Sequence, residues 1–600
     1  MKMSETNKIK KTKKNIGVLA LLLAVLFLLS ACSGGNNDNS ASGNNSAGTG
    51  TYPGIGTAPS ASPGTSHSSD TSMGATPPAF GSNSQSAGGS TVSDGTAGLN
   101  EPYPQGSVHD QVGNNTANSM PNLVNDDPNG ESYLTIDENR AINTAVESML
   151  TFSLKVDTAA YTNISRYIES GNQPPRDAVR TEELINYFKY DSQVSFDKDA
   201  PLGIYTEVGT SPFNKNSYTA LIRVKSRDID RSELPPSNLT FLIDTSGSMN
   251  SYDKLPLLQE SFALLTETLT KNDRVSIVTY AGSSDIVLDG ASGADTDRIL
   301  RAIYSLSAGG STAGADGIKT AYALAEKNYL RNGNNRVILA TDGDFNVGIS
   351  STDALAKLVA EKRGNGVYMS ILGFGTGNIR EDIMETLSKE GNGNYSYISD
   401  LSAARKVLVD ELSANLFTIA DDVKAQVEFN PANVKSYRLI GYENRSLRNE
   451  DFANDAKDAG EIGIGTDVIV MFELELYGNS SGSGYKYGGS GETVTPNYSD
   501  ERFGDELFEV RIRYKDPGEN ESKLITAPVL FDDISRSGST DFGFACSVAA
   551  FGDYLRGSRY GQAVSLNDIF KLAENNLGRD SAGYRLGFLQ LLNKYERFGG

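Results

Sequence analysis

Tryptophan is absent from this 600-residue chain, and histidine and cysteine occur only twice each. Both histidines, His67 and His109, lie in a segment rich in small polar residues. A Ser-His-Asp hydrolase needs a histidine to activate its serine, and most zinc sites need histidine or cysteine ligands. The scarcity of these residues argues against both kinds of site, and we assign no catalytic residue.

Nucleotide-binding motifs are also missing. The chain has no Walker-type lysine loop, and its "GFGTGN" from Gly373 has Asn378 where the dinucleotide fingerprint requires a third glycine. A Gly-x-Ser-x-Gly match from Gly478 to Gly482 falls inside a Gly/Ser insert and not at a strand-to-helix turn. The sequence therefore favours a protein that is not an enzyme.

The chain has fewer basic than acidic residues. It contains 54 Lys and Arg and 75 Asp and Glu, which gives a net charge of -21. A chain with this charge repels a phosphate backbone, so we expect no nucleic-acid partner. The same charge is compatible with binding of a cation.

The N-terminus has the pattern of an export signal. A lysine-rich start precedes an apolar segment from Ile16 to Leu29, which is followed by "LSAC" ending at Cys32. The apolar run is shorter than the ~20 residues that a membrane span needs, so it predicts a signal peptide over residues 1–31. Its removal would take away six lysines and one glutamate and change the net charge from -21 to -26.

Cys32 directly follows small residues, an arrangement that resembles the bacterial lipobox. This resemblance implies cleavage before Cys32 and acylation there, which would anchor the chain by a lipid in the cell membrane, facing outside the cytoplasm. With Cys32 acylated, Cys546 has no partner for an intrachain disulfide. Cys546 lies in the apolar stretch "FGFACSVAAF", which is typical of a small buried core residue.

Residues 32–130 are dominated by Ser, Gly, Asn, Thr and Pro. Such a composition cannot bury enough apolar surface to offset the entropy of the chain, so it predicts a disordered tether. A flexible tether lets the folded body range away from the membrane surface. We expect order to begin near Tyr133.

Residues 131–235 combine helix and strand patterns. "AAYTNISRYIESG" and "TEELINYF" predict helices, the second with Thr181 as its cap. Glu182 and Glu183 fall in the first turn of that helix, where the helix dipole favours acidic side chains. "GIYTEVGT" and "YTALIRVKS" then predict two strands.

Apolar strands and amphipathic helices alternate in residues 236–415. The predicted strands are Leu239–Ile243, Val275–Tyr280, Val337–Thr341, Val367–Gly373 and Tyr395–Ile398. Between the first two, apolar residues recur at helical spacing at Leu255, Leu258, Phe262, Leu265 and Leu269. This pattern predicts a doubly wound α/β domain with a mostly parallel sheet, whose ligand site lies at the carboxyl ends of the strands.

Residues 416–600 return to β-rich patterns and end in helices. Strands are predicted at "VKAQVEFN", "VKSYRLIGY", "DVIVMFELELY" and "LFEVRIRYK", and two helices at "LNDIFKLAENNLG" and "AGYRLGFLQLLNKYERF". Because β-rich segments flank the α/β segment on both sides, we expect them to pair into one accessory domain into which the α/β domain is inserted.

Polar residues follow the first predicted strand of the α/β domain, in "DTSGSM". Asp244, Ser246 and Ser248 lie where that strand ends, and two later loops contribute Thr312 and Asp342. The carboxyl ends of parallel strands meet at one edge of a sheet, so we expect these three hydroxyls and two carboxylates to lie together. Hard divalent cations such as Mg²⁺ prefer oxygen ligands of this kind.

This constellation resembles the metal-ion-dependent adhesion site (MIDAS) of von Willebrand factor type A (VWA) domains. The family has Asp-x-Ser-x-Ser in its first loop, a Thr in its second and an Asp in its third, matched here by Asp244, Ser246, Ser248, Thr312 and Asp342. The resemblance implies a six-stranded Rossmann-like domain that binds Mg²⁺, or Mn²⁺ or Ca²⁺, directly through the hydroxyls and through water by the aspartates. In the family, a carboxylate of the partner commonly completes the metal shell.

The flanking sequences resemble bacterial VWA-containing lipoproteins of the YfbK-like group, in "FSLKVDTAAYTNISRYIESGNQPPRDAVRTEELINYF" and "RLIGYENRSLRNEDFANDAKDAGEIGIG". The combined resemblance implies a membrane-anchored binding or adhesion module whose metal captures an acidic group of a partner protein or glycan. Two alternatives stay open. One is a structural scaffold for envelope assembly with a stabilising metal, and the other is a metal-dependent hydrolase that uses Asp244 as nucleophile or ligand.

Overall fold

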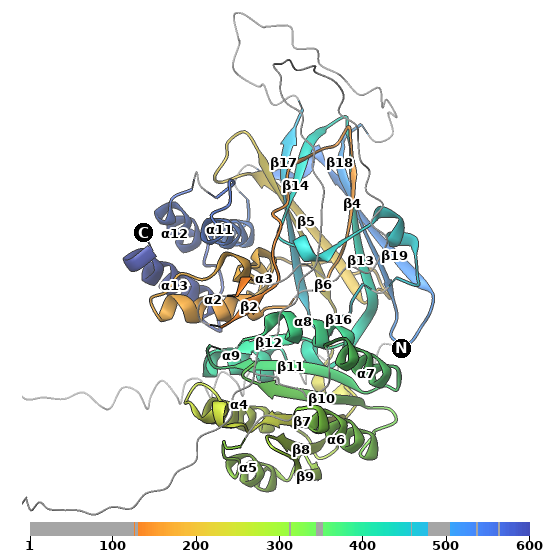
Figure 1. Ribbon diagram of the computed structural model, residues 1–600. Coiled ribbons are helices and arrows are strands. Elements are labelled where there is room, and N and C mark those ends of the chain that lie inside the picture. Colours follow the sequence, from red (N-terminus) through yellow and green to blue (C-terminus); the bar gives the residue numbers. More distant parts are fainter. Residues whose placement is uncertain are drawn as a thin grey trace, which may run out of the picture. The chain divides into compact units, whose positions relative to one another are not determined.

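Figure 1 shows the computed structural model, which describes residues 125–126, 130–155, 157–310, 314–343, 352–377, 379–457, 459–477, 504–535, 538–561 and 564–599. The predicted signal peptide, Cys32 and nearly all of the predicted tether lie outside these residues, and so does Thr312. Among the described residues, no helix is long and apolar enough to cross a membrane.

Six strands form the sheet of the α/β domain, in the spatial order β12-β11-β10-β7-β8-β9 (Figure 1). Five of them run parallel, and β9 pairs antiparallel with β8 at the edge. The strands are β7 (Ser237–Asp244), β8 (Arg274–Tyr280), β9 (Ser284–Ser292), β10 (Asn334–Thr341), β11 (Tyr368–Phe374) and β12 (Tyr395–Ile398). The predicted doubly wound, mostly parallel sheet is confirmed.

Helices cover both faces of this sheet. The face that carries Phe241 of β7 packs against α4 (Leu255–Thr266), α5 (Thr296–Tyr304), α9 (Leu401–Arg405) and α10 (Leu412–Leu416). The face that carries Leu242 packs against α6 (Gly314–Lys327), α7 (Thr352–Gly364) and α8 (Glu381–Glu390). Alternate residues of β7 thus enter two separate apolar cores, which explains the continuous apolar run of this strand.

Two further sheets of six strands each form the accessory domain. The first has the order β15-β4-β13-β18-β19, with β16 paired to β13, and the second has the order β20-β5-β6-β17-β14-β3. The strands before the α/β domain are β3 (Ile142–Asn143), β4 (Met149–Ser153), β5 (Leu202–Thr210) and β6 (Tyr218–Ser226). Those after it are β13 (Thr418–Phe429), β14 (Val434–Ile440), β15 (Ser446–Leu447), β16 (Ile462–Gly463), β17 (Asp467–Leu476), β18 (Glu506–Lys515), β19 (Ser522–Leu530) and β20 (Ile534–Ser535). Because β4 pairs with β13 and β6 with β17, the predicted insertion is confirmed.

The two accessory sheets share an apolar core between them. Phe429 of one sheet stacks on Tyr437 of the other with ring centroids 4.0 Å apart, and Phe472 meets Phe429 edge-on at 5.3 Å. Such aromatic pairs stabilise a fold by ~0.5–1.5 kcal/mol beyond the burial of their area. The sheets therefore pack as a sandwich.

A helical layer covers the other face of the second accessory sheet, with Leu221, Ile469 and Met471 of the sheet in the shared core. Its helices are α2 (Ala159–Glu169), α3 (Thr181–Asn186), α11 (Thr540–Leu555), α12 (Leu566–Asn575) and α13 (Tyr584–Gly599). The sequence does not predict α11, because a helix that is buried on nearly every side has no amphipathic period. Cys546 lies in α11 and is buried, as predicted.

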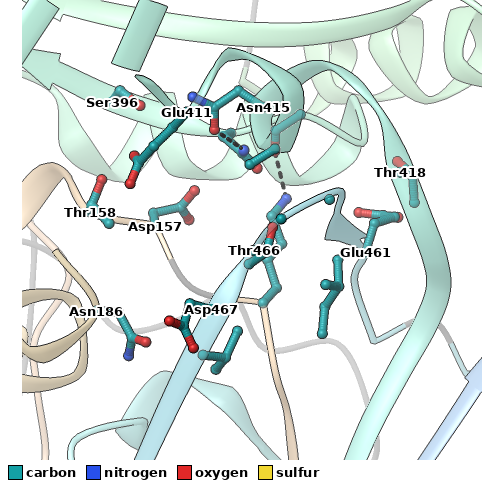
Figure 2. A pocket seen from close by; sticks show the side chains of 18 of the residues that line it. Asp157, Thr158, Asn186, Ser396, Glu411, Asn415, Thr418, Glu461, Thr466 and Asp467 are labelled. Atoms are coloured by element: carbon teal, nitrogen blue, oxygen red, sulfur yellow. Dashed lines mark hydrogen bonds between the residues drawn. The ribbon is translucent and has the colours of Figure 1, made fainter. Parts of the chain in front are cut away.

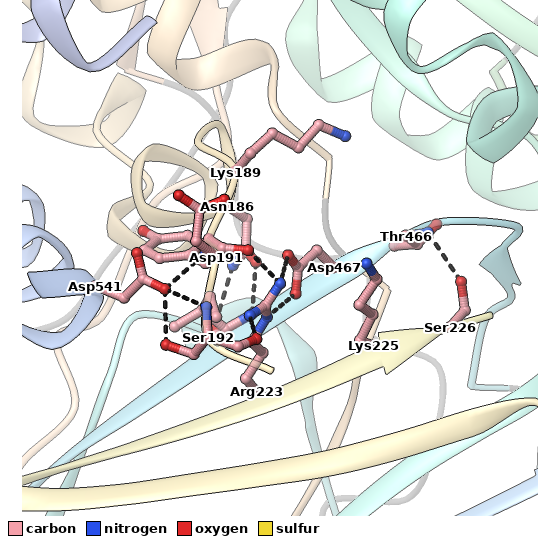
Figure 3. A network of polar contacts seen from close by, with 12 residues as sticks. Asn186, Lys189, Asp191, Ser192, Arg223, Lys225, Ser226, Thr466, Asp467 and Asp541 are labelled. Atoms are coloured by element: carbon pink, nitrogen blue, oxygen red, sulfur yellow. Dashed lines mark hydrogen bonds and ion pairs between the residues drawn. The ribbon is translucent and has the colours of Figure 1, made fainter. Parts of the chain in front are cut away.

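A buried polar network joins the helical layer to this sheet (Figure 3). Arg223 of β6 pairs with Asp467 of β17 at 2.6 Å and donates to the carbonyls of Tyr190 and Ser192. Asp541, in the first turn of α11, accepts hydrogen bonds from the backbone N–H and the hydroxyl of Ser192, each at 2.7 Å. The loop before β5 is thereby fixed between the sheet and α11.

Ordered structure begins earlier than the sequence predicts. β1 (Asn125–Asp126) pairs with β2 (Ser132–Tyr133), although residues up to 130 are predicted to be a disordered tether. Glu131 is 1 % exposed and pairs with Arg166 of α2 at 2.8 Å. The segment that follows the predicted tether is therefore part of the folded body.

A buried ion cluster lies where the helical layer meets the α/β domain. Arg180 is 1 % exposed, and its Nη2 lies 3.0 Å from Glu385 and 3.4 Å from Glu381, both on α8. Glu183 of α3 lies 3.6 Å from the same guanidinium. Burial raises the pKa of Glu381 to about 7, although Arg180 acts in the opposite direction.

The predicted cap of α3 is wrong, because Thr181 is its first residue and no side chain caps it.

Replacing Arg180 with Met would leave the buried carboxylates of Glu183 and Glu381 without their cation, and Glu385 with Arg445 alone. We expect the free energy of unfolding to fall by about 3–5 kcal/mol, measured by chemical denaturation. Arg448→Met is the control, since Arg448 is 73 % exposed and solvent screens its ion pairs with Glu450 and Asp451. Equal losses in the two variants would contradict this account of the cluster.

Candidate functional site

The first predicted loop begins at the carboxyl end of β7. Asp244 is fully buried, and its Oδ1 accepts a hydrogen bond from the backbone N–H of Ser246 at 2.8 Å. Its Oδ2 accepts from the hydroxyls of Tyr280 at 3.1 Å and Thr341 at 3.4 Å. The Oγ atoms of Ser246 and Ser248 are 2.9 Å apart. One carboxylate and two hydroxyls are thus held together at this edge of the sheet.

The second predicted loop is bound to the first by backbone hydrogen bonds. The N–H of Gly309 donates to the carbonyl of Thr245 at 2.8 Å, and the N–H of Gly247 donates to the carbonyl of Gly310 at 3.1 Å. Thr312 follows in this loop but lies outside the described residues. The structure therefore positions the start of the second loop beside the first and leaves the position of Thr312 a prediction.

The third predicted loop places Asp342 next to a lysine. Asp342 follows β10 and is fully buried, and its Oδ2 accepts a hydrogen bond from the Nζ of Lys254 at 2.8 Å. The side chain of Lys254 is 8 % exposed and comes from the turn before α4. The predicted site does not include Lys254. Its signal in the sequence is a charged residue at the start of an otherwise apolar helix, in "YDKLPLL".

A glycine loop confines this lysine. Gly375 has a φ of +74°, and a Cβ there would lie 2.4 Å from the Cγ and Cε atoms of Lys254. Two residues further on, the N–H of Gly377 donates to the Oε1 of Glu131 at 3.0 Å. Both glycines belong to the "GFGTGN" segment that fails the dinucleotide fingerprint, and they lie between Lys254 and the N-terminal segment.

Burial is the largest influence on the pKa of Asp244. It raises the pKa of Asp244 to about 6, the charge of Asp342 adds to this rise, and hydrogen bonds from Ser246 oppose it. Lys254 supplies one compensating positive charge. Within the described part of the chain, no group of three or more His, Cys, Asp or Glu side chains could hold a metal ion. A cation at this edge would therefore depend on the hydroxyls as well as on the carboxylates.

A methyl group added at Gly375 should disturb this arrangement. We expect Gly375→Ala to lower the free energy of unfolding by about 1–3 kcal/mol, because the left-handed backbone disfavours a side chain and the methyl group would displace Lys254. Gly364→Ala is the control, since no atom lies within 4 Å of a Cβ at this end of α7. Thermal and chemical denaturation compare the two variants, and a Gly375→Ala protein as stable as the control would rule out the confinement.

Three family models match the chain. The one described as von Willebrand factor type A domain matches residues 238–410. "Uncharacterized protein YfbK, C-terminal" matches residues 414–598, and "von Willebrand factor" matches residues 127–223. The matches cover the α/β domain and the regions on both sides of it.

Two relatives differ in how much of the chain they share. The chain is 41% identical over 472 residues to "Uncharacterized protein YfbK" of Escherichia coli (strain K12). The matched region covers 78% of this chain and 81% of that protein. It is 30% identical over 177 residues to "Calcium-activated chloride channel regulator 1" of Mus musculus. That matched region covers 29% of this chain and 18% of the mouse protein. The first similarity thus extends well beyond the α/β domain.

A solved structure, "von Willebrand factor type A from Catenulispora acidiphila", is similar to this chain in fold. The sequence identity is 15% and the TM-score is 0.37, with 65% of this chain and 91% of that chain covered.

Proposed function

The chain belongs to the YfbK family of proteins with a VWA domain, and we propose that it is a binding module that captures an acidic group of a partner protein or glycan through a divalent cation. The proposal rests on the convergence of Asp244, Ser246, Ser248 and Asp342 at one edge of the sheet. Mg²⁺ is the expected ion, with Mn²⁺ or Ca²⁺ as alternatives.

The side chains at this edge fit such an ion. Two hydroxyls lie 2.9 Å apart beside two buried carboxylates, and Mg²⁺ is usually held by few carboxylates, other oxygens and water. Ser246, Ser248 and Thr312 would hold the ion directly, and Asp244 and Asp342 would act through water, as in the VWA family. When bound, the ion would present positive charge to a carboxylate of the partner.

Lys254 would set the charge of the loaded site. Two aspartates and one lysine carry a net charge of -1, which a divalent cation changes to +1. One carboxylate from a partner then neutralises the site. Without the lysine, the loaded site would be neutral before any partner arrived. The ion pair between Lys254 and Asp342 therefore supports capture of an acidic group over capture of a neutral one.

We further propose that a lipid on Cys32 holds the protein at the cell membrane, facing outside the cytoplasm. Its support is the lipobox-like "LSAC" and the long polar segment between Cys32 and Asn125, where the described residues begin. The partner would then be another component of the cell envelope.

Titration of the full-length chain with MgCl₂ tests the metal site. A ligand that binds only the native state should stabilise it by about 2.7 kcal/mol at 100 times its Kd. Asp244→Ala and the double variant Ser246→Ala/Ser248→Ala should lose this response. Asp253→Ala, an aspartate on the same loop that pairs with Ser251, should keep it. A wild-type melting temperature that does not respond to Mg²⁺, or an equal response in Asp244→Ala, would refute the site.

Replacing Lys254 with Met should separate cation binding from capture of the acidic group. Loss of the positive charge beside Asp342 should tighten Mg²⁺ binding by about tenfold, or about 1.4 kcal/mol, measured by calorimetry. Because the loaded site becomes neutral, Mg²⁺-dependent adducts should decrease when the intact protein is crosslinked in its native envelope. Lys271→Met, an exposed lysine of the same domain, is the control. Weaker Mg²⁺ binding in Lys254→Met than in the control would sink the proposed role.

A structural scaffold for envelope assembly is the second candidate. It is favoured by the buried ion pairs that join the α/β domain to the rest of the chain. In that case Asp244→Ala would weaken folding but leave the recovery of crosslinked partners intact once stability is restored by other means. The hydrolase alternative requires metal-dependent turnover on phosphoester or glycoside panels, and its absence there would exclude that class.

A further inference from the structure

A basic cleft lies between the α/β domain and the accessory domain, in a chain whose net charge is strongly negative. Its volume is about 480 Å³, within the range of small-molecule sites. The cationic side chains that line it are Lys155, Arg363, Lys389, Arg445 and Lys457. Among the described residues the cleft has two carboxylates, Glu390 and Glu461, while Asp458 lies outside them.

Both domains contribute cations to the basic cleft. Arg363 lies in α7 and Lys389 in α8 of the α/β domain. Lys155 follows β4, and Arg445 and Lys457 lie between β14 and β16. The cleft therefore exists only when the two domains are packed together.

Lys155 reaches from one domain to the other. It is 6 % exposed, and its Nζ donates to the carbonyl of Gly393 at 2.6 Å. A Cβ on Gly460 would lie 2.7 Å from the Cβ of Lys155, so the glycine lets the lysine pass. Lys155 forms no ion pair with any described residue, which leaves a buried positive charge that only a neutral carbonyl contacts.

The turn at Asn392 gathers two guanidinium groups beside this lysine. Arg363 donates to the side-chain Oδ1 of Asn392 at 2.9 Å, and Arg336 donates to its carbonyl at 3.3 Å. Arg336 is 3 % exposed, its Nε has no hydrogen-bond partner, and it forms no ion pair within the described part of the chain. Burial lowers its pKa to about 10. Positive charge is thus concentrated at the contact between the domains.

The remaining cations differ in how they are matched. Arg445 is paired with buried carboxylates, including Glu385 at 3.1 Å. Lys389 and Lys457 are exposed and form no ion pair with a described residue. Although the residue is exposed overall, desolvation lowers the pKa of Lys389, and the nearby charges of Arg445 and Lys155 add to this effect. Glu385 and Glu390 act on this pKa in the opposite direction.

The neighbouring polar pocket of Figure 2 is a poorer ligand site. It has a volume of only about 90 Å³ and shares Lys155 with the basic cleft. Carboxylates that Figure 2 shows around it are already matched, because Glu411 pairs with Lys406 and Asp467 pairs with Arg223, each at 2.6 Å. Space and unmatched positive charge coincide in the basic cleft.

We propose that the basic cleft binds a small phosphate-bearing anion. Three of its cations, Lys155, Lys389 and Lys457, form no ion pair with a described residue, and the described carboxylates of the cleft are Glu390 and Glu461. Guanidinium and ammonium groups from several sides match the several oxygens of a phosphate. Because both domains supply cations, the bound anion also strengthens the contact between them.

Titration of the full-length, metal-free chain with pyrophosphate tests this site. Calorimetry and thermal denaturation at ~0.15 M salt should show saturable binding and a rise in melting temperature. Lys389→Ala/Lys457→Ala should weaken the binding by about tenfold or more. The double variant should fold normally, because both side chains are exposed.

Lys319→Ala/Lys327→Ala is the matched control, with the same loss of charge. These lysines lie on α6, 62 % and 63 % exposed, and do not line the cleft. The control should bind pyrophosphate like the wild type. Absence of saturable binding to the wild type, unchanged affinity in Lys389→Ala/Lys457→Ala, or an equal loss in the control overturns the proposal.

Two further titrations distinguish the source of the phosphate. Glycerol phosphate represents a soluble ester, and vesicles that contain phosphatidylglycerol represent a lipid headgroup. Binding of glycerol phosphate that depends on Lys389 and Lys457 supports a soluble ligand. Binding of the vesicles alone, with the same dependence, supports the same chemistry with a lipid as its source. Binding of neither would count against a phosphate ester as the ligand.

Discussion

One buried guanidinium, that of Arg180, neutralises carboxylates that come from two parts of the chain. Glu183 belongs to the helix that precedes the α/β domain, whereas Glu381 and Glu385 lie inside that domain. A buried charge costs several kcal/mol unless it is paired. Any arrangement of the inserted domain that separates these groups would therefore be less stable. The cluster thus favours a single placement of the inserted domain. The basic cleft between the domains takes its geometry from that placement.

Burial on both faces decided which strands the sequence could reveal. β7 and β10 are buried at every position and appear as continuous apolar runs, whereas β9 at the sheet edge is largely exposed and has no such run. The sequence did not predict α11 for the opposite reason. This helix is buried on nearly every side, so its apolar residues do not recur with the helical period. Thr181 was expected to cap a helix by its local sequence, but its surroundings in the folded chain bury it as the first helical residue. The local sequence pattern does not show contacts with segments that are far away in the chain.

At the candidate site, the sequence could locate Asp244, Ser246, Ser248 and Asp342, because a parallel sheet brings together whatever follows its strands. It could not reveal Lys254. A lysine at the start of a helix is ordinarily solvated, and its burial here depends on an aspartate and a glycine loop far away in the chain. The basic cleft was hidden for the same reason, since its cations come from separate segments that meet only when the domains pack.

Glu131 attaches the start of the ordered body to the loop that confines Lys254. The N–H of Gly377 donates to its carboxylate, and Arg166 pairs with the same group. The strand pair β1–β2, the ion pair with Arg166 and the hydrogen bond from Gly377 therefore hold the start of the ordered body together. Gly377 lies two residues from Gly375, the glycine that packs against Lys254. One short loop thus contacts both the start of the ordered body and the lysine that pairs with Asp342 at the candidate site.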